Sequence, residues 1–77
     1  MENKDILDFK VGTQTIREMS AITFLGWLAK KIDGQPSYSA SIVELSMAVS
    51  HPPMTGTMED NGKIDLVRKL LRAGITL

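Results

Sequence analysis

The amino-acid sequence predicts a small α+β domain, with an N-terminal β-hairpin at residues 6–18 and three helices at residues 21–33, 42–50 and 63–73. Three observations predict this fold class. Apolar and polar residues alternate on both sides of a Gly-Thr pair, as in a two-residue hairpin. Apolar residues recur at helical spacing in the three later segments. The 77 residues are enough for one domain, residues 1–77, and without cysteine it has no disulfide.

The hairpin is centred on Gly12. This glycine favours a type II′ turn, because φ is positive at the first turn position and glycine adopts that value without strain. The resulting register places Phe9 opposite Ile16 on one face. It places Asp8 opposite Arg17 on the other face. We therefore expect an apolar pair toward the core and an ion pair toward solvent.

The segment 21–33 has the clearest helical pattern of the chain. Ser20 is suited to cap its first turn, and Gly34 is suited to end it in the left-handed conformation. The apolar stripe consists of Ala21, Leu25, Leu28 and Ile32, widened by Ile22, Phe24 and Ala29.

Two further helices follow. Ser41 and Glu44 match a capping box, which predicts a short helix at 42–50 that buries Ile42, Leu45 and Val49. Residues 51–62 contain two prolines and two glycines and have no period, so we expect a long loop. The last helix should begin near residues 61–63 and end at Gly74. Its wide apolar arc predicts burial on more than one side.

Composition and charge exclude several classes of function. Nine basic and nine acidic residues cancel, which argues against binding driven by overall charge to nucleic acid or lipid. The polar start and the interrupted apolar runs predict neither a signal peptide nor a membrane span, and we expect a cytoplasmic protein. His51 is the single histidine and has no partner at a catalytic or metal-ligand spacing. We expect no enzyme activity and no cofactor.

Trp27 does not fit the apolar stripe of its helix. It projects about 140° from the centre of the stripe, among polar residues and beside Phe24. Tryptophan is enriched in binding hot spots, so an exposed Trp27 would mark a partner site. The alternative is that the hairpin or the 51–62 loop covers it. Methionines of that loop could adapt to a partner. The predicted partner-binding residues are Thr23, Phe24, Trp27, Lys30, Lys31, Met54 and Met58.

These features favour a non-enzymatic protein–protein interaction module that binds through an apolar patch around Trp27. Its role would be that of an adaptor, assembly factor or inhibitor, of the kind that phages and accessory genetic elements encode. The partner would be another protein or a second copy of the chain. Neither a membrane nor a small-molecule substrate is expected.

The alternative hypothesis is a small DNA-binding regulator. The basic face of the last helix would contact phosphates through Lys63, Arg68, Lys69 and Arg72. The helix order, with segments 41–45 and 70–75, resembles that of winged helix-turn-helix regulators. It departs from them because about twelve residues, rather than three or four, join the last two helices. The same bases could instead form a solvated face, with an Asp65–Lys69 pair one turn apart.

Overall fold

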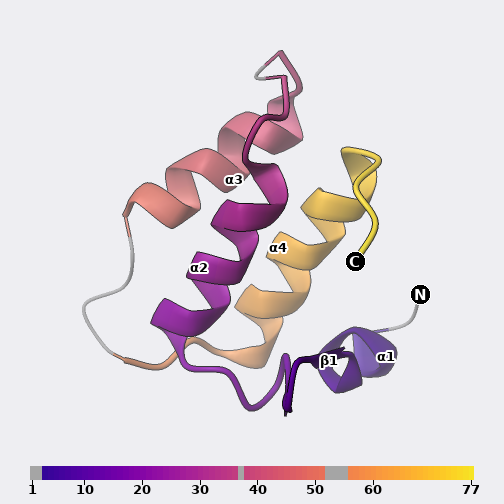
Figure 1. Ribbon diagram of the computed structural model, residues 1–77, viewed down its shortest axis with the longest axis vertical. Helices are drawn as coiled ribbons and strands as arrows, with labels where there is room; N and C mark the ends of the chain where they lie inside the picture. The colour runs from indigo at the N-terminus through magenta and orange to yellow at the C-terminus, as the bar shows by residue number, and fades with distance from the viewer. Residues whose placement is uncertain (1–2, 37, 52–55) are drawn as a thin grey trace.

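The protein forms a short antiparallel hairpin followed by helices, as the sequence predicts (Figure 1). The computed structural model describes residues 3–36, 38–51 and 56–77. Along these residues the elements are α1 (Asn3–Asp8), β1 (Lys10–Val11), β2 (Gln14–Thr15), α2 (Ala21–Ile32), α3 (Ala40–Ser50) and α4 (Asp60–Arg72). None of the helices in the described part of the chain is long and apolar enough to cross a membrane.

The hairpin has the expected register. Lys10 pairs with Thr15, and the Ile16 N–H donates to the Phe9 carbonyl oxygen at 3.0 Å. Gly12 has a φ of 68°, whereas Thr13 has no positive φ, which is the φ pattern of a type II′ turn. The expected opposition of Asp8 and Arg17 is also present, as an ion pair of 3.4 Å.

The strands are shorter than expected. Residues 3–8 form helix α1, where the sequence suggested that a strand begins at residue 6. Ile6 and Leu7 are both buried. In a strand these neighbours would point to opposite faces, whereas in the helix, which contacts α4, both are buried.

Helix α2 begins and ends where its caps predict. The Ser20 Oγ accepts the Thr23 N–H at 3.2 Å, and Gly34 follows the helix with a φ of 79°. The Ala21 N–H donates to the Gly56 carbonyl oxygen at 3.1 Å, which ties the described end of the 51–62 segment to the start of α2. The expectation that Ile22 belongs to the buried stripe is wrong, because its side chain is 72% exposed.

Helix α3 packs against α2 and α4 and buries Ile42 and Leu45, with Val49 half-buried. The capping box predicted at Ser41 and Glu44 is wrong, because the helix begins two residues earlier than predicted, at Ala40. Its N-cap residue is Ser39, which makes no side-chain cap hydrogen bond with the described residues.

Helix α4 contacts both α1 and α3, so its wide apolar arc is buried on more than one side. It begins at Asp60, slightly before the predicted start, and the connection from α3 is correspondingly shorter than the expected 51–62 loop. Gly74 has a φ of 82° and ends the helix as predicted. There the Gly74 N–H donates to Leu71, and the Ile75 N–H donates to Leu70, which completes a Schellman motif.

Candidate partner-binding site

A surface cleft of about 480 Å³ lies between the hairpin turn and the outer side of α2. The α2 residues of its lining lie roughly 110° or more from the centre of the buried residues of α2, which are Ala21, Phe24, Leu25 and Leu28. The lining residues are Val11, Gly12, Thr13, Gln14, Met19, Ile22, Thr23, Gly26, Trp27 and Lys30.

Trp27 is half-buried and belongs to both the core and the cleft. Its ring centroid lies 6.0 Å from that of Phe24, with the two planes tilted by 35°. The Lys31 Nζ lies 5.9 Å from the Trp27 centroid, within range of a cation–π contact. The hairpin therefore flanks Trp27 without covering it completely, a result between the two alternatives that the sequence left open.

Ile22 and Gly26 complete the apolar part of the cleft, and neither is among the partner-binding residues predicted from the sequence. Ile22 lies on the opposite margin of the outer face from Trp27 and is mostly exposed. A Cβ added at Gly26 would meet no atom within 4 Å, so the helix backbone lies open between the two side chains. The signal that could have found them is the spacing of Ile22, Gly26 and Lys30, which are successive i, i+4 neighbours.

The other predicted partner-binding residues are divided by the structure. Thr23 and Lys30 line the cleft and are exposed. Lys31 is half-buried, and its Nζ donates to the main-chain oxygen of Leu77 at 2.7 Å. Met58 is half-buried against the core, and Met54 lies outside the described residues.

The expectation that Phe24 lies on the binding surface is wrong. Its side chain is fully buried in the core. The helix turns Phe24 about 60° from Trp27, toward the buried stripe, and this is enough to separate a core ring from a cleft ring.

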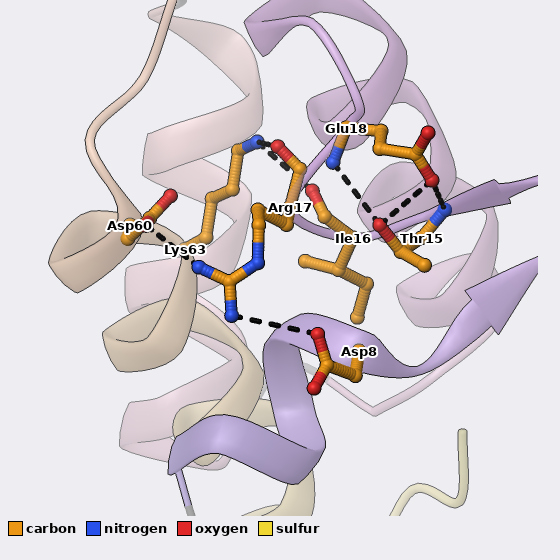
Figure 2. A network of polar contacts seen from close by, with 7 residues as sticks. All are labelled: Asp8, Thr15, Ile16, Arg17, Glu18, Asp60 and Lys63. Atoms are coloured by element: carbon orange, nitrogen blue, oxygen red, sulfur yellow. Dashed lines mark hydrogen bonds and ion pairs between the residues drawn. The ribbon is translucent and has the colours of Figure 1, made fainter.

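The expectation that Lys63 lies on an exposed basic face is also wrong. Lys63 is only 2% exposed. Its Nζ donates to the carbonyl oxygens of Ile16 at 2.9 Å and Arg17 at 3.0 Å (Figure 2). It also donates to the carbonyl oxygen of Met19 at 2.7 Å. Three acceptors satisfy the three N–H donors of an ammonium group. Burial lowers the pKa of Lys63, and the charge of Asp60 opposes that shift.

The rest of the predicted basic face is partly neutralised. The Lys69 Nζ lies 2.9 Å from an Asp65 oxygen, as the sequence suggested, and 3.4 Å from a Glu44 oxygen on α3. The hydrogen bond that Lys69 donates to the Asp65 carboxylate is the main reason that the pKa of Lys69 is raised. Arg68 and Arg72 are exposed. The nine residues 51–59 between α3 and α4 exceed the short turn of a helix-turn-helix.

A polar network holds the hairpin wall of the cleft in place. Arg17 pairs with Asp8 at 3.4 Å and with Asp60, at the start of α4, at 3.2 Å (Figure 2). In the turn after β2, the Glu18 carboxylate accepts from the Thr15 N–H at 2.8 Å, while the Thr15 Oγ1 accepts from the Glu18 N–H at 3.3 Å. This is a capping box, and its hydrogen bonds from Thr15 lower the pKa of Glu18.

No protein-family model matches the chain, and neither a curated protein nor a solved structure matches it. The fold and the site together describe a small helical domain with a hairpin-flanked apolar cleft. The function is therefore inferred from the cleft itself.

Proposed function

We propose that this protein is a non-enzymatic protein–protein interaction module and that its partner binds in the cleft around Trp27 and Ile22. The observation that supports this function is an exposed aliphatic side chain opposite a half-buried indole, with the bare backbone of Gly26 between them. An adaptor, assembly factor or inhibitor would use such a surface. A cytoplasmic location, which the cysteine-free sequence favours, belongs to the same proposal.

The apolar side chains of this cleft would contribute to the free energy of binding when a partner covers them. Burying an isoleucine side chain fully contributes about 2 kcal/mol. Ile22 is mostly exposed in the isolated protein, so most of that contribution is gained when a partner covers it. Trp27 is already packed on Phe24, so its ring is ordered before binding and less side-chain entropy is lost.

The charge of the cleft specifies the partner further. Lys30 is the charged residue of the lining, and it lies on the exposed end of the α2 face. We therefore expect the partner to insert an apolar side chain near a carboxylate. An exposed ion pair of this kind contributes little affinity, about 0.5 kcal/mol, but it orients the partner.

The test compares Ile22→Glu with Met47→Glu. Both residues are exposed and aliphatic, and Met47 lies on α3, outside the cleft. The immobilised wild-type chain is used to capture proteins from cells that express it. A captured protein other than the chain itself is then purified and titrated with each variant. The affinity should fall at least about tenfold with Ile22→Glu, since a charge is desolvated against Trp27, and should be unchanged with Met47→Glu. Equal affinity of both variants would contradict the proposal.

The basic face of α4 does not support a comparable proposal for DNA. Lys63 is used internally, and Lys69 is paired with two carboxylates. We therefore retain protein binding as the function that the site supports best.

A further inference from the structure

The Lys31 side chain joins two parts of the molecule that are far apart in sequence. Its Nζ donates to the main-chain oxygen of Leu77 at 2.7 Å and to that of Thr76 at 3.3 Å. The same Nζ lies 5.9 Å from the centroid of the Trp27 ring. Lys31 therefore links residues 75–77, which we call the tail segment, to the indole that lines the cleft.

The tail segment is held in place by contacts of its own. The Ile75 N–H donates to the Leu70 carbonyl oxygen at 3.3 Å, in the turn that ends α4. The side chains of Ile75 and Leu77 are half-buried and pack against the core. The main-chain oxygens that accept from Lys31 thus belong to an anchored segment.

This anchor fixes the cation relative to the indole. A lysine side chain has a flexible four-carbon stem and many rotamers. Two acceptors direct the Lys31 ammonium, and the side chain is half-buried. Trp27 and Lys31 are i, i+4 neighbours on α2, so the directed ammonium lies beside the ring. A cation at this distance is attracted to an indole, and the attraction increases as the cation is desolvated.

Two contacts therefore restrain the Trp27 ring in the free protein. Phe24 packs against it from the core, with 6.0 Å between the ring centroids. Lys31 supplies the second contact. A partner that enters the cleft meets a ring whose orientation is already set, and less side-chain entropy is lost on binding.

We propose that Lys31 is a positioning residue of the Trp27 cleft and that the tail segment acts through Lys31 on partner binding. The effect on a partner rests on the proposed function. Lys30 provides the contrast, because it is exposed and lines the cleft, whereas the Lys31 ammonium is directed at the main chain. Coupling between two sites is reciprocal, so a bound partner should also stabilise the tail segment.

The order of the Trp27 ring in the free protein tests this link without a partner. The chain has one tryptophan, so its indole N–H gives one signal in NMR relaxation. The order parameter of that N–H should be about 0.85 in wild type and should fall toward about 0.6 in Lys31→Met, which keeps an apolar stem but has no donor. Lys31→Arg retains a cation with several donors and should restore the wild-type value. Lys69→Met, which removes a paired lysine of α4, is the control and should change nothing.

Leu77→Ser tests the other end of the link, because it removes an apolar anchor of the tail segment. It should lower the order parameter as Lys31→Met does, and the double variant should show no further loss, since both changes break one contact. Thr76→Ala alters an exposed side chain of the same segment and should have no effect. Circular dichroism checks that the helices are retained, and Leu77→Ala replaces Leu77→Ser if they are not.

Partner titration gives the functional readout. Lys31→Met should lower the affinity for a captured partner at least about fivefold, and Lys31→Arg should not. Unchanged ring order in Lys31→Met or in the Leu77 variant overturns the proposal, and so does unchanged affinity when the ring is disordered. The Ile22→Glu comparison tests the proposed function separately. If no partner is captured, the proposed function fails, and the ring order still decides whether Lys31 positions Trp27.

Discussion

The Lys63 Nζ lies 2.7 Å from the carbonyl oxygen of Met19, and this contact joins α4 to the segment between the hairpin and α2. The ammonium group also donates to the main-chain oxygens of Ile16 and Arg17, and it lies 6.0 Å from the centroid of the Phe24 ring. Lys63 is therefore a structural residue of the core, although its type suggests a surface position.

Lys63→Met should destabilise the protein by roughly 2–4 kcal/mol. The substitution keeps most of the side-chain volume but removes the hydrogen bonds to Ile16, Arg17 and Met19, so each of these carbonyl oxygens loses one donor. Urea unfolding followed by circular dichroism measures the change. Lys30→Met, at an exposed position, is the control and should change stability by less than about 0.5 kcal/mol. Equal effects at both positions would contradict the structural role of Lys63.

Gly26→Ala should stabilise the fold and weaken partner binding. Alanine is favoured over glycine inside a helix by about 1 kcal/mol, and the added methyl group meets no atom within 4 Å beyond its chain neighbours and the backbone of its own helix. The same methyl group enters the cleft between Ile22 and Trp27. Thermal unfolding and partner titration should therefore change in opposite directions.

Gly34→Ala is the matched control for that experiment. Gly34 has a φ of 79°, so alanine is strained there and should destabilise the protein by about 1 kcal/mol. A loss of stability with Gly26→Ala as well would show that the backbone at Gly26 is not open in solution.

The capping box of Glu18 predicts a pH dependence. The pKa of Glu18 is lowered below its ordinary value of 4.5 in the folded protein, first by the hydrogen bond from the Thr15 N–H. The ionised carboxylate therefore stabilises the fold at pH values above 4.5, and this contribution is lost as the pH falls through the lower folded-state pKa. Glu18→Gln removes the contribution at neutral pH.

The measurement is the free energy of unfolding of both proteins between neutral and acidic pH. Wild-type protein should be more stable than Glu18→Gln near pH 7, and the two curves should converge in acid. Glu59→Gln is the control, because Glu59 makes no side-chain cap hydrogen bond with the described residues. If the free energies of unfolding of wild type and Glu18→Gln changed with pH in parallel, the ionised Glu18 carboxylate would not stabilise the fold.

Trp27 is the one tryptophan of the chain, so its fluorescence reports on the cleft directly. Because the indole is half-buried, acrylamide should quench it less than in the unfolded chain. The double variant Ile22→Trp with Trp27→Phe moves the indole to the more exposed margin and should be quenched more strongly. Equal quenching of the two folded proteins would mean that Trp27 is fully exposed.

Local signals predicted those parts of the fold that depend on neighbouring residues. The turn glycine and the cross-strand pairs fixed the register of the hairpin, and Ser20, Gly34 and Gly74 gave the ends of two helices. The capping-box pattern was less decisive, because it occurs both at Thr15–Glu18 and at Ser41–Glu44. Only the first pair forms the two reciprocal hydrogen bonds of a capping box, in the turn after β2.

The contacts that define the candidate site depend on residues distant in sequence. Lys63 binds carbonyl groups 44 to 47 residues away, and no local pattern specifies that contact. The helical period of α2 identified Trp27 as outside the stripe, but the period alone could not show which margin of the stripe is buried. That distinction separates exposed Ile22 from buried Phe24.

Helix α4 supports the cleft without lining it. Its residues Asp60 and Lys63 hold the segment that carries Arg17, and this segment connects the hairpin wall to α2. The hairpin wall of the cleft is thus anchored by a helix that does not line the cleft. Substitutions in the first turn of α4 should therefore change the shape of the cleft from a distance, and variants that alter binding need not map the surface where the partner sits.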